Sequence, residues 1–194
     1  MQNQIQQAIQ ILQQGGVVIF PTDTAFGIGC RMDDEIAIKK LFSVKERPMN
    51  QAVPVLVGSI KMAKEYWEET SSEVENLTHL YWPGALTIVY PCKSEKVSQL
   101  VRGEGNLLGL RQPGHPTTLA LIQALGVPLI GTSANIHGEP TPFSHLDLDA
   151  ELLQRVDFVV EGECTICEPS TVLDCSEKPW KVLRQGAVIV EETV

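Results

Sequence analysis

Polar side chains that could bind a charged ligand gather in short segments beside the expected strands. Residues 21–29 read Pro-Thr-Asp-Thr-Ala-Phe-Gly-Ile-Gly and follow an apolar run. In open α/β sheets, such strand ends form the crevices in which ligands bind. Hydroxyl groups and glycines there would let a polar ligand approach the backbone, but a capped turn explains them equally well. The segment is no dinucleotide fingerprint, because the third glycine is missing, and the chain has no phosphate-loop sequence.

Residues 45–48, Lys-Glu-Arg-Pro, come at the end of an expected helix. The proline ends the helix, which should direct the side chains of Lys45 and Arg47 away from it. Such pairs commonly bind phosphoryl groups. The same two cations would also complement the dipole of the helix, so both interpretations stay open.

Two further segments place hydroxyl groups beside expected strands. Residues 131–135, Gly-Thr-Ser-Ala-Asn, leave a buried strand, where polar groups are costly unless a ligand satisfies them. Residues 169–174, Pro-Ser-Thr-Val-Leu-Asp, come at the start of a strand instead. Arg111 and Arg184 each close an expected strand, where an arginine suits bidentate capture of a carboxylate or phosphate.

Composition narrows the classes of protein. The 194 residues carry a formal charge of −9, which argues against a chain whose main task is to grip a phosphate backbone. No export signal precedes the five cysteines, and no apolar run is long enough for a membrane, so we expect a cytoplasmic protein with reduced thiols. Cys164 and Cys167 lack the second pair that a structural zinc site needs, so we expect no metal bound by side chains.

Hydrophobic periodicity predicts an α/β fold with a largely buried sheet. Asp33 and Asp34 can cap a helix through Val44, and Ser72 with Glu75 is a plausible capping box. The other expected helices cover residues 5–12 and 117–125. The expected strands cover residues 17–20, 53–57, 86–90, 107–110, 129–130, 158–160, 171–173, 181–183 and 187–190, of which the second contains Pro54 and therefore suits an edge or a strand start.

Taken together and in order, these segments resemble the YrdC-like family, whose bacterial members include threonylcarbamoyl-AMP synthases of the TsaC type. The resemblance covers nearly the whole chain and implies a single catalytic domain over residues 1–194. It implies an open, twisted mixed sheet with flanking helices around a central concave cleft. The segments that carry it are residues 21–29, 45–48, 82–84, 111–116, 132–135, 169–174 and 184–186.

The resemblance implies an activity and a set of site residues. Members of the family convert L-threonine, bicarbonate and ATP into threonylcarbamoyl-AMP and pyrophosphate, with Mg²⁺ bound mainly through the ATP phosphates. Partner proteins of tRNA modification then transfer the threonylcarbamoyl group. By this resemblance, Lys45 and Arg47 would be catalytic, and Thr24, Arg111 and Thr171 would bind threonine. The residues that would bind ATP are Lys45, Arg47, Gln51, Thr132, Ser133, Asn135, Thr141 and Arg184.

Several positions depart from the commoner family pattern. Phe26 stands where tyrosine is usual, and Gln51 replaces asparagine or lysine. Leu56 occupies the place of a histidine that meets threonine in longer relatives, and Leu107 replaces a polar residue. The threonine side of the cleft should therefore differ from that of those relatives.

Two other functions stay open at this stage. The first is a module that binds RNA or tRNA, and weak tRNA binding would also be compatible with the enzyme. The second is a divergent paralogue that acts on a different carbamoyl-adenylate. The formal charge of −9 argues against the first, and retention of Lys45, Arg47 and residues 133–135 favours synthesis over the second.

Overall fold

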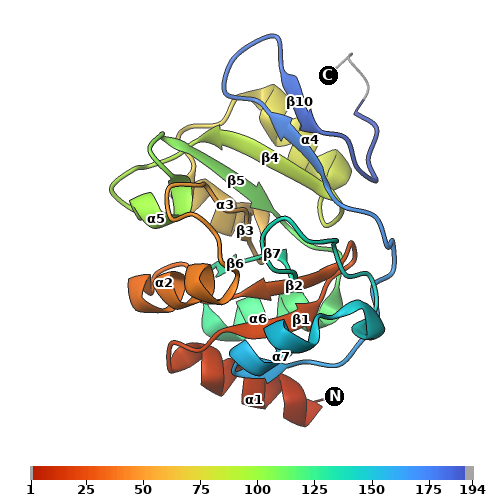
Figure 1. Ribbon diagram of the computed structural model, residues 1–194. Helices are drawn as coiled ribbons and strands as arrows, with labels where there is room; N and C mark the ends of the chain where they lie inside the picture. The colour runs from red at the N-terminus through yellow and green to blue at the C-terminus, as the bar shows by residue number, and fades with distance from the viewer. Residues whose placement is uncertain (1, 191–194) are drawn as a thin grey trace.

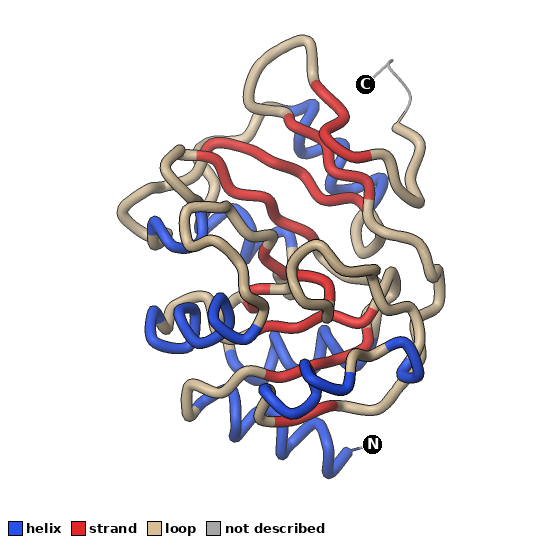
Figure 2. Tube along the Cα trace, in the orientation of Figure 1, coloured by secondary structure: helices blue, strands red, loops and turns tan. Residues whose placement is uncertain are grey.

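The computed structural model describes residues 2–190 and contains two open, mixed β-sheets with flanking helices (Figures 1 and 2). The mixed α/β class expected from the sequence is therefore confirmed, although the strands divide into two sheets. The helices are α1 (Gln2–Gln13), α2 (Glu35–Val44), α3 (Ile60–Tyr66), α4 (Ser72–Tyr81), α5 (Gln99–Arg102), α6 (Pro116–Leu125), the 3₁₀ turn η1 (His145–Asp147) and α7 (Ala150–Arg155).

The smaller sheet has the strand order β7-β2-β1-β8. Its strands are β1 (Val18–Pro21), β2 (Phe26–Gly29), β7 (Thr132–Ser133) and β8 (Phe158–Val159). Strand β1 is buried along its whole length and pairs antiparallel with β2 and parallel with β8. Helices α1 and α6 lie beside β1 (Figure 1), and their apolar residues, among them Leu12 and Leu121, form a core with Phe20.

The larger sheet has the order β10-β9-β4-β5-β3-β6. Its strands are β3 (Val55–Leu56), β4 (Leu86–Pro91), β5 (Leu107–Arg111), β6 (Leu129–Ile130), β9 (Thr171–Asp174) and β10 (Lys181–Arg184). Strand β3 begins directly after Pro54 and is paired on both sides, so the proline marks a strand start and not an edge.

Side chains of the larger sheet alternate between the core and a cleft, as the two-residue period of a strand requires. Ile88 and Leu110 join the main hydrophobic core with Trp67 and Leu77, which belong to the helical side of the sheet. Val89 and Gly109, the neighbours in sequence of two of these residues, line a cleft on the opposite face. The same strands thus build the core and one wall of the cleft.

The two sheets meet through main-chain contacts around β6. Ile130 N donates to Cys30 O just beyond β2, while β6 also pairs with β3 of the larger sheet. A Cβ atom placed on Gly29 would lie only 1.7 Å from Ile130 O. This close approach requires glycine at position 29, because any side chain would force the sheets apart.

Three local predictions from the sequence were wrong. Residues 187–190 form no strand, because the main chain of Val188 bonds the side-chain hydroxyl group of Thr171 and not the main chain of a strand. The cap of α4 is Ser71, whose Oγ accepts from Val74 N, so the cap lies one residue earlier than expected and Glu75 does not complete a capping box with it. No strand was expected over residues 26–29, yet they form β2 against β1.

The capped helix α2 agrees with expectation, since the carboxylate of Asp34 accepts from Ile36 N and Ala37 N. Among residues 2–190, no helix is both long enough and apolar enough to cross a membrane.

Candidate active site

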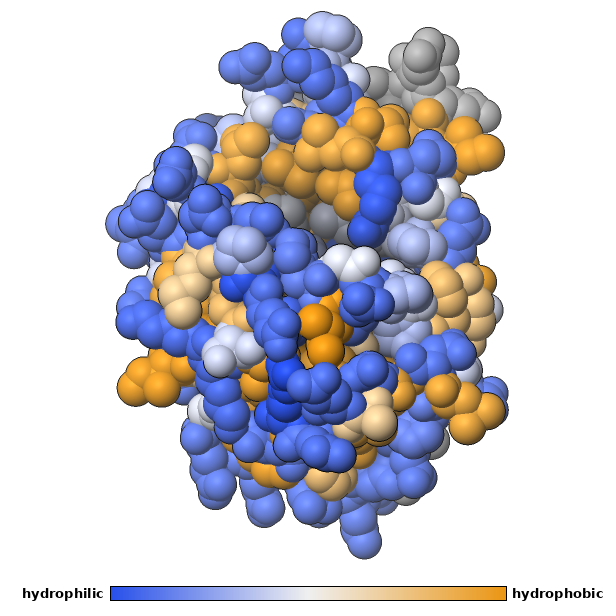
Figure 3. Space-filling view, viewed as in Figure 1, coloured by the Kyte–Doolittle hydropathy of each residue, from blue (hydrophilic) through white to orange (hydrophobic). Residues whose placement is uncertain are grey.

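A cleft of about 580 Å³ lies between the two sheets and is lined by residues of both. Four arginines line it, namely residues 47, 102, 111 and 184, against a single carboxylate, Asp174, among the described residues. The cleft is therefore locally basic in a chain whose formal charge is −9. Figure 3 shows apolar side chains over the larger sheet at the upper side of this hollow, which gives the cleft a polar end and an apolar end.

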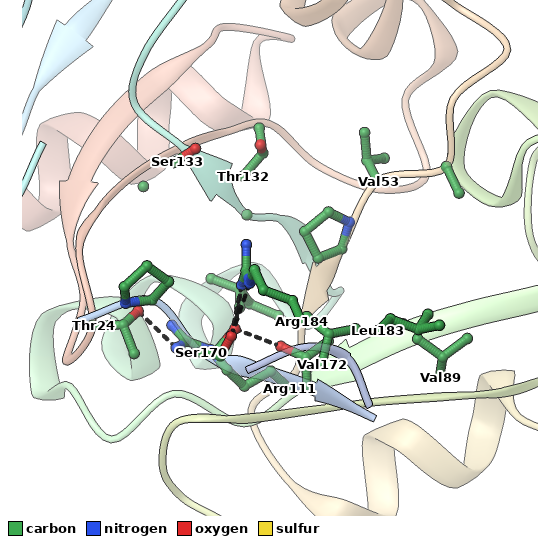
Figure 4. Close-up of a pocket in the computed structure, with 18 of the residues that line it drawn as sticks. Thr24, Val53, Val89, Arg111, Thr132, Ser133, Ser170, Val172, Leu183 and Arg184 are labelled. Atoms are coloured by element: carbon green, nitrogen blue, oxygen red, sulfur yellow. Dashed lines mark hydrogen bonds between the residues drawn. The ribbon is translucent and has the colours of Figure 1, made fainter. Parts of the chain in front are cut away.

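Arg111 and Thr24 meet at the polar end of the cleft (Figure 4). Arg111 Nη1 donates to Thr24 Oγ1 over 2.7 Å, and Arg111 Nη2 lies 3.3 Å from Asp23 Oδ1. Burial lowers the pKa of Arg111, while the negative charge of Asp23 opposes that shift. Sequence reasoning placed Arg111 and Thr24 in the site but gave no role to Asp23.

The turn before β2 combines the two interpretations that the sequence left open. Thr22 Oγ1 accepts from Thr24 N and Ala25 N and donates to Ala25 O, so its hydroxyl group caps the turn. Thr22 and Thr24 nevertheless both line the cleft. The turn is structural, and its conformation presents Thr24 to Arg111.

Arg184 is held on the opposite wall by Ser170. Its Nε and Nη2 donate to Ser170 O over 3.0 and 2.8 Å, and Nη2 also contacts Ser170 Oγ over 3.0 Å (Figure 4). Ser170 Oγ lies 2.9 Å from Thr87 Oγ1. Burial lowers the pKa of Arg184. Ser170 and Thr87 line the cleft but were not among the predicted site residues.

Lys45 and Arg47 point in different directions, although the proline after them was expected to direct both off the helix. Lys45 is 2% exposed, and its Nζ donates to Asn135 O and, over 2.6 Å, to Ser133 O. Burial, followed by the charge of Arg47, lowers the pKa of Lys45 to about 7. Lys45 thus binds the loop after β6 and does not line the cleft, because two backbone carbonyls capture its amine.

Arg47 is the member of this pair that lines the cleft. Its Nη2 donates to Ala52 O over 2.8 Å, and burial lowers its pKa. Its Nε is buried and has no hydrogen-bond partner among residues 2–190. One donor of this guanidinium group is therefore unpaired within the described part of the chain.

Strand β7 and the segment after it contribute hydroxyl groups to the cleft. Thr132 and Ser133 line it together with Thr141 from the following segment. Asn135 does not, because its Nδ2 donates to Ile136 O and Glu139 O. It thereby fixes the loop from behind.

Two other predicted site residues lie outside the cleft. Thr171 is fully buried, and its Oγ1 donates to Val188 O and accepts from Gly186 N. Gln51 is exposed on the surface and is absent from the cleft lining. The structure therefore brings together Thr24, Arg47, Arg111, Thr132, Ser133, Thr141 and Arg184, and leaves Lys45, Gln51, Asn135 and Thr171 around them.

Three of the four positions that depart from the family pattern face the cleft. Phe26, Leu56 and Leu107 all line it. All five cysteines are free, and residues 2–190 contain no group of three His, Cys, Asp or Glu side chains arranged to hold a metal ion.

Comparisons with known proteins agree with this architecture. The model of the Sua5/YciO/YrdC family, described as "Telomere recombination", matches residues 10–186. Threonylcarbamoyl-AMP synthase of Bacillus subtilis is 34% identical over 190 residues, which are 97% of this chain and 55% of that protein. The Vibrio cholerae protein of the same name is 34% identical over 185 residues, which are 94% of this chain and 97% of that protein.

A solved structure gives the same result. The crystal structure of Pyrococcus abyssi Sua5 complexed with L-threonine superposes with a TM-score of 0.89 at 33% identity, covering 94% of this chain and 54% of that one. The fold and the cleft define an α/β domain with a basic ligand-binding site between two sheets. The chain belongs to the Sua5/YciO/YrdC family, which confirms the resemblance found in the sequence. It spans about half the length of the Bacillus and Pyrococcus relatives.

Proposed function

We propose that this protein is a threonylcarbamoyl-AMP synthase, which forms threonylcarbamoyl-AMP and pyrophosphate from L-threonine, bicarbonate and ATP. The observation that carries the proposal is the convergence of Arg47, Arg111 and Arg184 on one cleft rich in hydroxyl groups. Such a site binds carboxylates and phosphates without offering a nucleophile. The names of relatives at 34% identity add the reaction.

The arrangement of the cleft suggests how the ligands divide it. Arg111 and Thr24, which are bonded to each other, would bind the carboxylate and hydroxyl groups of threonine. Arg47 and Arg184 would bind the nucleotide phosphates, and Thr132, Ser133 and Thr141 would add hydroxyl contacts. In this proposal, Lys45 and Asn135 serve ATP through the loop that they hold.

Thr171 and Gln51 fit the proposal less directly. Thr171 would act on the threonine side by fixing the chain next to Ser170 and Arg184. Gln51 stays a predicted phosphate contact.

The reaction asks the protein mainly for orientation and charge neutralisation. The amine of threonine and bicarbonate, or CO₂ formed from it, give an N-carboxylate, whose oxygen attacks the α-phosphorus of ATP as pyrophosphate leaves. In-line attack requires both reactants to be held in place. Arg47, which is partly buried, would stabilise the negative charge that grows on the leaving group more strongly than an exposed arginine could, and the more exposed Arg184 would add its charge.

We also propose that Mg²⁺ accompanies ATP and is bound mainly through the phosphates. The single lining carboxylate, Asp174, already accepts hydrogen bonds from Ser176 N and Ser176 Oγ, so the described residues fit an ion that keeps phosphate and water ligands. When bound, such an ion neutralises phosphate charge. The proposed setting is the cytoplasm, with partner proteins of tRNA modification as recipients of the product.

The test is pyrophosphate release by the purified protein. We expect release to require ATP, bicarbonate and L-threonine together, and serine to be a poorer substrate because it lacks the methyl group that the site would enclose. Equal ATP consumption without threonine would overturn the proposal. A screen of other amino acids separates this synthase from a paralogue that makes a different carbamoyl-adenylate, which would prefer another amino acid.

A further inference from the structure

The carboxylate of Asp23 is buried directly behind the polar end of the cleft. Its side chain is 3% exposed, and Asp23 is not among the residues that line the cleft. Neither carboxylate oxygen has a hydrogen-bond partner among residues 2–190, while Oδ1 forms an ion pair with Arg111 at 3.3 Å. A buried carboxylate without hydrogen bonds is costly, which calls for a reason to keep it there.

A surrounding loop seals this carboxylate from solvent. The amides of Thr165 and Ile166 donate to Asp23 O, which clamps residues 163–166 over the turn. His115 Nε2 bonds Glu163 O over 3.2 Å on another side, and a Cβ on Gly114 would lie 3.4 Å from Asp23 Oδ2. The carboxylate is packed in place and cannot reach a ligand in the cleft.

Arg111 is the cation that forms an ion pair with this carboxylate. One end of its guanidinium group donates to Thr24 Oγ1 and the other faces Asp23, so two partners fix its plane. Arg184 is close enough that its positive charge also acts on Arg111. An uncompensated Arg111 would be repelled by Arg184 and would tend to turn toward water.

We propose that Asp23 is a positioning residue that holds the Arg111 guanidinium in the orientation required for the amino-acid substrate. This inference rests on the proposed function and deepens it. Asp23 acts through Arg111 and makes no contact with either substrate. Its loss should therefore affect the use of threonine and spare the use of ATP.

The direct test is Asp23→Asn, which keeps the shape of the side chain and removes its charge. We expect the KM for threonine to rise between about 10- and 100-fold, as for a misplaced orienting group. The KM for ATP should stay within about twofold, as for a site without a shared partner. A threonine KM equal to that of the wild type, or an equal rise in both KM values, would overturn the proposal.

A matched control is Asp157→Asn. Asp157 pairs with Lys40 and accepts from Val17 N, far from the cleft lining, so this variant should lower thermal stability and leave both KM values unchanged. The control separates a specific effect on Arg111 from a general loss of folded protein.

A double-mutant cycle tests the coupling and remains informative if Asp23→Asn folds poorly. In an Arg111→Met background, Asp23 has no cation to hold, so Asp23→Asn should cost less stability there than in the wild type. Equal costs in the two backgrounds would overturn the coupling. If the wild-type protein releases no pyrophosphate, the proposed function fails, whereas this stability cycle still reports whether Asp23 supports Arg111.

Discussion

The cations in and around the cleft are held in two different ways. Arg111 faces the carboxylate of Asp23, so its charge is already balanced by another charge of the protein. Arg47 and Arg184 on the walls of the cleft, and Lys45 outside its lining, are bonded to backbone carbonyls, and none of them forms an ion pair within residues 2–190. Carbonyl dipoles orient a cation without cancelling its charge.

This difference matches the charges of the two proposed substrates. An amino acid is a zwitterion whose single carboxylate needs one oriented partner, whereas a triphosphate brings several negative charges. Arg111, whose charge is balanced by Asp23, suits the single carboxylate of an amino acid. Arg47 and Arg184, which have no ion-pair partner within residues 2–190, suit the several negative charges of a triphosphate. The hydrogen-bond partners of these cations thus support the proposed division of the cleft between threonine and ATP.

The largest expected effect comes from removing a cation at the unbalanced end. Arg47→Ala should lower kcat/KM for ATP by about 100- to 1000-fold, because it deletes a donor aimed at developing charge. Thermal stability should change little, since Arg47 makes one hydrogen bond to Ala52 O. Steady-state pyrophosphate assays at varied ATP check this, and a normal rate would remove Arg47 from the site.

A smaller effect is expected when Arg111 is replaced by another cation that lacks the planar guanidinium group. Arg111→Lys retains a cation beside Asp23 but cannot bind Thr24 and a carboxylate through one planar fork. We expect the threonine KM to rise about tenfold, as for loss of one good interaction, with the ATP KM unchanged. A rise in the ATP KM instead would mean that the two ends have been assigned the wrong way round.

The smallest effect concerns the stability of the loop that Lys45 holds. The pKa of Lys45 is lowered from 10.5 to about 7 when folded, so the unfolded chain binds more protons between these values. Stability should therefore rise with pH above about 7, with a contribution from Lys45 of at most about 1.4 kcal/mol per pH unit.

Urea unfolding from about pH 7 to about pH 8.5, where free thiols begin to ionise, measures this slope. Lys45→Met should flatten it, and the exposed Lys40→Met should not, because the amine of Lys40 keeps access to water. Identical slopes in the wild type and Lys45→Met would show that Lys45 gains no proton when the protein unfolds in this pH range.

Much of the fold could be predicted because buried strands and capped helices leave strong patterns. Strand β1 is four consecutive buried residues, and α2 is capped by the expected Asp34. Strand β7 was missed because Thr132 and Ser133 are small polar residues that pair over only two positions. Nothing in such a segment distinguishes a short strand from a loop.

The site could be predicted where the backbone fixes the direction of a side chain. Arg111 and Arg184 end strands, and both line the cleft. No pattern near Lys45 indicates that the carbonyl groups of Ser133 and Asn135, about 90 residues further along the chain, would bind its amine. For Thr171, a usable signal was present, since Val172 lines the cleft and strand neighbours point to opposite faces.

The contact between Gly29 and Ile130 has a consequence for the energetics of recognition. Since the sheets touch backbone to backbone there, the gap between them is fixed by covalent geometry and hydrogen bonds before any ligand arrives. The two sides of the cleft therefore need little rearrangement when a ligand binds, and little of the binding free energy is spent on ordering them. Glycine at position 29 thus helps to set the separation of the two sheets that form the walls of the cleft.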